Sequence, residues 1–282
     1  SNSATPLERP KALEGREFLT DDEVAELKKR AARLFQSGNS DFASGDNVFL
    51  AALANVEQYK NPNSTHGSDN MVEREFDNRT SLIIDPPDGK IPPLTPEARQ
   101  RQAATEARQR IPAGPEDLSN ALRCITYGVP RLGGNWGAGP YSYYQILQSP
   151  GYVALTMEVI HDVRIIPLDG RPHPPRNIPQ WNGDSRGRWE GKTLVVDTTN
   201  FSPKSYFMGS SENLHLVERF TRVDADTIRY EITLSDPTTW TKPWTAVIPL
   251  KRTPDAIYEF ACHEGNYALM LGMLAAARAE QK

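Results

Sequence analysis

The stretch YVALTMEVIHDVRIIPL, residues 152–168, predicts a β-strand with one almost wholly apolar face. Successive side chains of a strand point to opposite faces, so every second residue shares a face. Counting by twos places His161 on the same face as Val153, Leu155, Met157, Val159, Val163 and Ile165. We therefore expect His161 to point into the core of a sheet, where an imidazole needs a hydrogen-bonding partner.

Short runs of alternating apolar residues, separated by turn signals, continue on both sides of this stretch. They cover residues 142–149, 193–201, 214–223, 227–236, 244–252 and 256–264. Short alternating runs of this kind are typical of an antiparallel sheet, and closing such a sheet removes its exposed edges. We predict an α+β protein with an antiparallel β-barrel-like (lipocalin-like) sheet, N-terminal helices and an extended arm.

The chain divides into two expected regions. Residues 1–123 should form a helical and extended region that wraps the barrel, and residues 124–282 should form the barrel-like domain with its C-terminal helix. The arm, residues 80–95, is too short to own a core. We expect its apolar side chains to pack on the outside of the barrel, namely Leu82, Ile83, Ile84, Ile91 and Leu94.

Helix starts are marked by capping residues. Thr20 with Glu23 three positions later forms a capping box. Thr95 as N-cap, followed by Pro96 at the first helical position, predicts a second start. Residues 47–59 and 266–282 are further helix candidates.

Composition narrows the classes of partner. The formal net charge of −4 gives no reason to expect nucleic acid or an anionic membrane. No apolar run approaches the roughly 20 residues of a membrane span. Motifs for nucleotide cofactors, α/β-hydrolases and zinc sites are missing, so we expect neither a cofactor nor a metal. His161, His215 and His263 make a poor metal set, because strand alternation separates the first two.

Polar side chains occupy two further inward positions. Glu218 shares a face with Leu214, Leu216 and Phe220, and Tyr230 shares one with Ile228, Ile232 and Leu234. Unpaired burial of such groups costs several kcal/mol, so we expect His161, Glu218 and Tyr230 to partner one another or a ligand. The alternative is a purely structural role, with Glu218 paired to Arg164 or Arg219.

Aromatic residues and a proline-rich loop suggest a ligand pocket. Trp136, Tyr143 and Tyr144 lie in or beside a Gly/Pro loop that could cover an apolar ligand. Trp244 could form a pocket wall or belong to the core, and His173, in a rigid proline loop, could lie at the cavity mouth. DSRGRWEG, residues 184–191, is expected to be a salt-bridged turn, with anion binding as the alternative.

These residues lead to one main functional hypothesis and two alternatives. The protein is expected to bind a small, largely apolar organic molecule in a barrel cavity and to perform acid–base lyase or isomerase chemistry on it. His161 would act as base or acid, Glu218 would orient it, and Tyr230 or Tyr144 would donate to a developing oxyanion. The alternatives are a non-catalytic lipocalin-type binding protein and a structural, envelope-associated protein. An oligomer is compatible with each.

The two cysteines, Cys124 and Cys262, could form one disulfide or remain two buried thiols. We expect them within disulfide reach.

Several motifs resemble those of a family of bacterial proteins, frequent in acidobacteria and sphingomonads, many of which carry export signals. The resemblance covers residues 79–278 and rests on LIIDPPDG, IHDVRIIPLDGRPH, WEGKTLVVDTTNF and ACHEGNY. It transfers no catalytic residues. It implies an exported protein, periplasmic or secreted, and thereby favours the disulfide. Ser1 and Asn2 look like a protease-site remnant, so we expect that a leader peptide has been removed.

Overall fold

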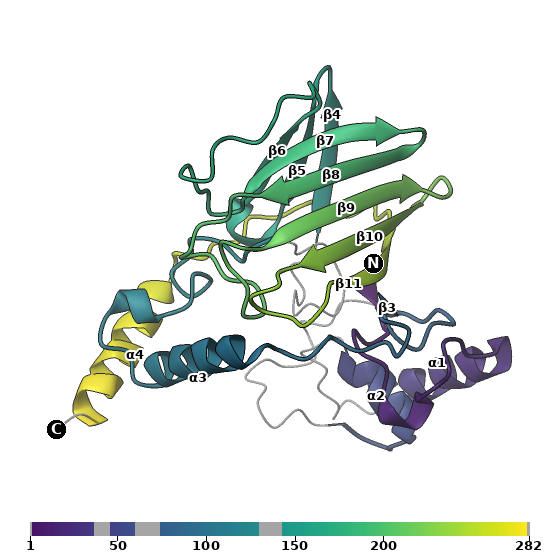
Figure 1. Ribbon diagram of the computed structural model, residues 1–282. Helices are drawn as coiled ribbons and strands as arrows, with labels where there is room; N and C mark the ends of the chain where they lie inside the picture. Colours follow the sequence, from purple (N-terminus) through teal and green to yellow (C-terminus); the bar gives the residue numbers. More distant parts are fainter. Residues whose placement is uncertain (1, 37–45, 60–73, 130–142, 281–282) are drawn as a thin grey trace.

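The computed structural model describes residues 2–36, 46–59, 74–129 and 143–280 (Figure 1). Its helices are α1 (Asp21–Gln36), α2 (Asp46–Ala54), α3 (Pro96–Arg110) and α4 (Asn266–Glu280), with short 3-10 turns at Lys11–Leu13 (η1), Pro115–Asp117 (η3) and Val159–His161 (η4). Its strands are β1 (Asn2–Ser3), β2 (Arg74–Glu75), β3 (Ile83–Asp85), β4 (Tyr144–Ser149), β5 (Tyr152–Met157), β6 (Val163–Pro167), β7 (Asp184–Glu190), β8 (Thr193–Thr199), β9 (His215–Arg222), β10 (Thr227–Ser235) and β11 (Trp244–Lys251).

Two antiparallel sheets form the body of the molecule. One has six strands in the order β3-β11-β10-β9-β8-β7, and the other has three in the order β4-β5-β6. The principal hydrophobic core combines the inner face of the large sheet with side chains of the small one, such as Leu155 and Ile166. The α+β class and the antiparallel strands are therefore confirmed. These two sheets are separate, however, and do not form the closed barrel that we expected; β1 and β2 pair in a small parallel sheet of their own.

The stretch that opened the sequence analysis is two strands and not one. The chain leaves β5, turns through η4 and returns antiparallel as β6, with Leu155 opposite Arg164. Ile160 and His161, at φ of 57° and 56°, lie in the left-handed region and reverse its direction. The turn changes which residues face inward after it, because the turn residues do not alternate between the two faces as strand residues do. Beyond it Arg164 and Ile166 are buried, and His161 is exposed.

The segment predicted as a salt-bridged turn is strand β7. The alternating pattern did not predict this strand, because its inward-facing positions carry the small residues Ser185 and Gly187 and not large apolar ones. β6 packs directly against it: a Cβ added to Gly187 would lie 2.7 Å from Cγ2 of Ile166. This Cβ would also lie 2.6 Å from Cδ2 of Leu168, so the close approach of the two sheets favours glycine at this position.

The predicted strand at residues 256–264 is absent. This segment has no strand or helix assignment, and the backbone N–H of Tyr258 donates to the Glu158 carboxylate at 3.1 Å. The prediction failed because alternating apolar residues form a strand only where a neighbouring strand edge is available.

The arm belongs to the fold, but it does not lie outside the sheet. β3 adds to the edge of the large sheet, with Ile83 opposite Ala246 of β11. Leu82 and Ile83 are fully buried in the principal core, and Ile91 packs against it.

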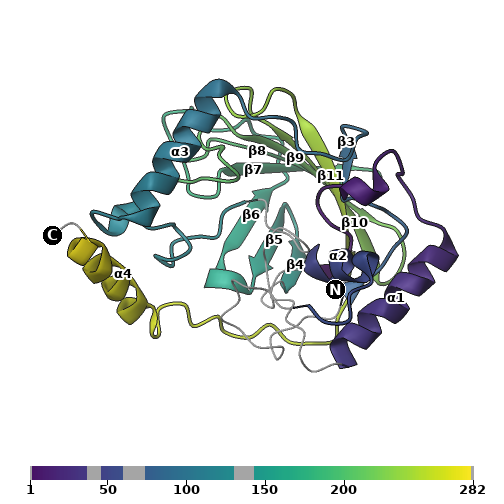
Figure 2. The ribbon, with the colours of Figure 1, turned by 90° about the horizontal axis from the view of Figure 1, so that it is seen from below.

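Both predicted helix starts are confirmed. The Thr20 N–H donates to Oε2 of Glu23 at 2.8 Å, and the Glu23 N–H donates to Oγ1 of Thr20 at 3.3 Å. Oγ1 of Thr95 accepts from the Ala98 N–H at 3.1 Å. Figure 1 shows the helices below the sheets, and Figure 2, seen from below, shows α1 and α2 on the right and α3 and α4 on the left.

Cys124 and Cys262 form a disulfide, with their Cα atoms 5.9 Å apart. It joins residues separated by 138 positions and ties the segment before α4 to the chain that precedes the small sheet. Asn266, the first residue of α4, also donates to the Leu122 carbonyl at 2.5 Å. No helix in the described ranges is both long and apolar enough to cross a membrane.

Candidate functional site

Glu218 lies at the centre of a buried polar network between the two sheets. Arg164 of β6 contacts both of its carboxylate oxygens, with Nη1 3.0 Å from Oε1 and Nη2 2.5 Å from Oε2. The Tyr230 hydroxyl donates to Oε1 at 2.7 Å. Nη2 of Arg164 also lies 3.1 Å from Oγ of Ser185 and 3.2 Å from Oγ1 of Thr198.

This network has a structural function, because it joins the two sheets through groups that are almost fully enclosed. The side chains of Arg164 and Glu218 are 4% and 0% exposed. Burial, together with the charge of Glu218, raises the pKa of Tyr230 well above its usual range, so Tyr230 stays a donor.

The expected contact between His161 and Glu218 is therefore wrong. Because η4 interrupts the strand, His161 lies in an exposed turn, and Arg164 takes the inward position instead. Of the three residues expected to form a catalytic group, only Glu218 and Tyr230 are in contact. The alternative partner for Glu218, Arg164, is the one observed.

A cavity of about 390 Å³ lies between the sheets at the end where the hairpins of the large sheet turn. Its apolar walls come from both sheets, and they include Tyr144, Ile146, Leu155, Leu194, Phe220, Ile228 and Leu250. Strand alternation places these side chains: Ile146 enters the cavity, and its neighbour Leu147 is 48% exposed on the other face. The cavity falls in the size range typical of small-molecule sites.

Two of the expected ligand-binding residues, Tyr143 and Tyr144, line this cavity. The Tyr143 hydroxyl lies 3.4 Å from Oδ2 of Asp255, and burial, followed by that carboxylate, raises the pKa of Tyr143. Phe220 forms another wall and stacks on the buried Tyr230, with ring centroids 4.7 Å apart. The aromatic stack closes the inner end of the cavity, so Glu218 and Tyr230 are not among its described lining residues.

Charged side chains surround the mouth of the cavity. Lys192, Arg222, Lys251 and Arg252 line it, together with a single carboxylate, that of Asp226. The four cations and one anion give the described lining a net charge of +3, in a chain whose formal net charge is −4.

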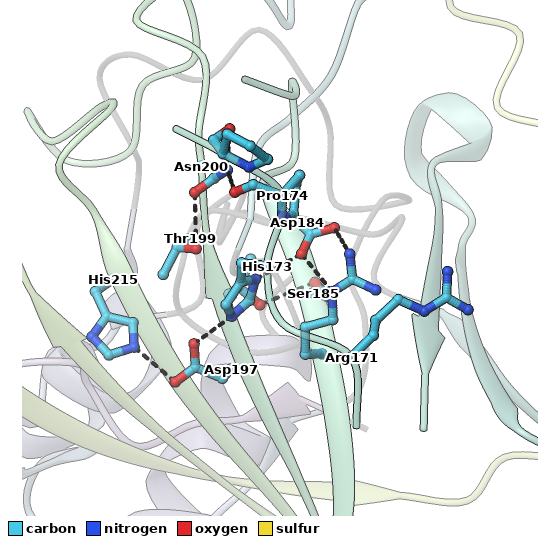
Figure 3. A network of polar contacts seen from close by, with 12 residues as sticks. Arg171, His173, Pro174, Asp184, Ser185, Asp197, Thr199, Asn200 and His215 are labelled. Carbon is cyan, nitrogen blue, oxygen red and sulfur yellow. Dashed lines mark hydrogen bonds and ion pairs between the residues drawn. The ribbon is translucent and has the colours of Figure 1, made fainter. Parts of the chain in front are cut away.

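A second polar network lies on the outer face of the large sheet (Figure 3). His173 of the proline loop is held between two carboxylates, with Nδ1 2.6 Å from Oδ2 of Asp184 and Nε2 2.9 Å from Oδ1 of Asp197. Asp197 also contacts Nε2 of His215 at 2.8 Å. Arg186 makes a bidentate contact with Asp184, at 2.7 and 2.9 Å.

This outer network clamps the proline loop onto the sheet. Each ring nitrogen of His173 contacts a carboxylate, one on β7 and one on β8. The hydrogen bond with His215 lowers the pKa of Asp197, and the same bond raises the pKa of His215. His173 is not among the described residues that line the cavity, so its expected place at the mouth is wrong. The tight turns of its loop direct it to the opposite face.

Trp244, also expected to bind the ligand, is not among the described residues that line the cavity. Trp244 is fully buried in the core, in an edge-on contact with Trp240 at 5.7 Å between ring centroids. It therefore packs the core and does not form a pocket wall. Trp136 lies outside the described residues. Within the described ranges, no group of three or more His, Cys, Asp or Glu side chains is arranged to hold a metal ion.

The sequence pattern did not lead us to predict the cationic mouth, although the sequence contains a signal for it. Arg222 and Lys251 end strands β9 and β11, and Lys192 lies in the turn before β8. In antiparallel hairpins such positions gather at one end of a sheet. Sequence alone does not show which of these ends borders a cavity, because that depends on how the second sheet packs.

Comparison with known proteins gives no match to a family model, a curated protein or a solved structure.

Proposed function

We propose that this protein binds a small, largely apolar organic molecule in the cavity between its two sheets. The observation that carries the proposal is the cavity's composition: aromatic and aliphatic side chains from both sheets enclose a space of about 390 Å³. Small-molecule sites are typically concave, mostly apolar and largely preformed, with a few polar groups that orient the ligand.

Binding is favoured over the acid–base step expected of His161, Glu218 and Tyr230, because none of the three is in the described cavity lining. The described lining contains neither a histidine nor a glutamate. The carboxylate of Glu218 already accepts hydrogen bonds from Arg164 and Tyr230, and His161 lies in the exposed turn. A general base must come within hydrogen-bond reach of the proton that it removes. The lyase or isomerase step expected from these residues is therefore not part of the proposal.

We further propose that the protein works in an oxidising compartment, periplasmic or secreted. The disulfide between Cys124 and Cys262 supports this, because such bonds persist outside the reducing cytosol. The resemblance to exported bacterial proteins points to the same location.

The binding proposal is tested by filling the cavity. Ile146→Trp places an indole inside it, and Leu147→Trp adds the same group on the exposed face of β4. Titration with phenylnaphthylamine, a neutral apolar fluorophore, should give saturable binding to the native protein and to Leu147→Trp. Ile146→Trp should weaken binding by about tenfold or more, because the indole occupies the ligand's space.

Equal binding by both variants, with circular dichroism unchanged, would place the fluorophore elsewhere on the protein and contradict the proposal. Absence of saturable binding to the native protein would also contradict it.

A further inference from the structure

The mouth of the cavity differs from its walls in charge. The walls are aromatic and aliphatic, whereas Lys192, Arg222, Lys251 and Arg252 meet at the mouth. They come from three places in the chain: the β7–β8 turn, the end of β9 and the end of β11. The antiparallel register brings them together, since Lys251 is opposite Thr227, the first residue of β10.

The contacts of these side chains orient them: the acceptors of Arg222 are neutral, whereas Lys251 also interacts with the carboxylate of Asp224. Nε and Nη2 of Arg222 donate to the backbone carbonyls of Asp224 and Ala225, at 3.1 and 3.0 Å. These acceptors are neutral, so they hold the guanidinium without cancelling its charge. Nζ of Lys251 donates to the neutral Thr227 hydroxyl at 2.9 Å.

Two carboxylates lie near the mouth: that of Asp224 is hydrogen-bonded in the hairpin turn, and that of Asp226 is exposed to water. Asp226 lies 3.6 Å from Arg252, and both side chains are largely exposed to water. Asp224 accepts the backbone N–H of Asp226 at 2.8 Å in the hairpin turn. That bond, with a smaller contribution from Lys251, lowers the pKa of Asp224. The lining as a whole stays positive.

We propose that the ligand is an amphipathic organic anion, with an apolar body between the sheets and a carboxylate or sulfonate at the mouth. This inference rests on the proposed function and adds the ligand's charge to it. Lys192, Arg222 and Lys251 attract and orient the anionic group. A charged group at the mouth stays hydrated, so it avoids the desolvation cost of the interior.

The depth of the cavity favours a compact body over a long chain. On β9 it extends inward from Arg222 to Phe220, and on β10 it ends at Ile228, before the buried Tyr230. On β4 the lining runs from Tyr144 to Gln148, so at about 3.3 Å per residue the cavity spans roughly 7 Å along β9 and roughly 13 Å along β4. A fused or linked ring system fits these lengths.

A matched pair of fluorophores tests the inference. Anilinonaphthalene sulfonate and phenylnaphthylamine share one aromatic body, and only the first carries an anion. The native protein should bind the sulfonate about fivefold to thirtyfold more tightly, as expected for two or three partly exposed charges. The preference should shrink as salt rises, because mobile ions screen charges at the mouth.

Variants without some of these charges test whether the preference for the sulfonate comes from the cations at the mouth. Lys192→Gln with Lys251→Gln should remove most of the preference for the sulfonate, measured as the ratio of the two dissociation constants in the same variant. Arg219→Gln with Arg229→Gln is the control, because it removes the same charge from the same sheet outside the described cavity lining. The control should keep the preference.

The outcomes separate this inference from the proposed function. If phenylnaphthylamine binds in the cavity and the sulfonate binds no more tightly, the inference fails and the proposed function stands. If the cavity-filling Ile146→Trp substitution changes the binding of neither fluorophore, both the inference and the proposed function fail. A salt-independent preference in the native protein overturns the inference even if the charge variants do not fold.

Discussion

Replacing Glu218 with glutamine should destabilise the fold strongly without affecting the ligand cavity. The carboxylate is fully buried and accepts two hydrogen bonds from Arg164 and one from Tyr230. The substitution leaves the buried Arg164 guanidinium without its counter-charge, and a single amide oxygen replaces the two carboxylate oxygens beside the two hydroxyl groups. Breaking a buried ion pair in this way costs about 3 to 5 kcal/mol in free energy of unfolding.

The loss can be measured by urea unfolding and by thermal melting. Trp240 and Trp244 are buried in the core, so their fluorescence reports its exposure. For a chain of this size the expected loss corresponds to a fall in Tm of roughly 5 to 8 °C. Glu231→Gln is the control, because Glu231 lies on the outer face of β10 and pairs with Arg229 near the surface. It should cost less than about 1 kcal/mol.

Removing the whole network should restore stability. Arg164→Met combined with Glu218→Leu and Tyr230→Phe exchanges the buried polar groups for apolar ones of similar size. Such exchanges are often neutral or stabilising, so the triple variant should be more stable than Glu218→Gln alone. A loss below about 1 kcal/mol for Glu218→Gln, or a triple variant less stable than it, would refute this account of how the sheets are joined. Loss of ligand binding at full stability would instead give Glu218 a functional role.

Two further predictions concern the close contact between the sheets and the outer network. Gly187→Ala should destabilise the protein by about 1 to 3 kcal/mol in a thermal melt, because the added Cβ overlaps Ile166 and the packed sheets must separate; an unchanged Tm would show that the contact can relax. The contact between His215 and Asp197 should stabilise the fold by less than about 1 kcal/mol, since both side chains are partly exposed. Because the pKa of His215 is raised and that of Asp197 is lowered, this stabilisation should be full between about pH 4 and 6.5, and decline as the pH rises through the folded pKa of His215 or falls through that of Asp197. Comparing native protein with His215→Gln across this range measures the difference, and a difference that grows above pH 7 would contradict the assignment.

Local features were predicted from the sequence because they depend on neighbours along the chain. The capping box of Thr20 and Glu23 and the N-cap at Thr95 are decided by side chains within one helical turn. The alternation in residues 214–223 and 227–236 correctly placed Glu218 and Tyr230 inward, because no turn interrupts either strand.

Features that depend on packing were decided only by the tertiary structure. The apolar run of residues 152–168 contains no glycine or proline at its turn, so nothing local marked the reversal at Ile160 and His161. Because of that reversal, Glu218 contacts Arg164 and not His161, the partner expected from the sequence. The cavity likewise depends on how far the small sheet stands from the large one. Alternation determines which face a side chain takes, but only the packing of the two sheets determines whether that face meets core, cavity or water.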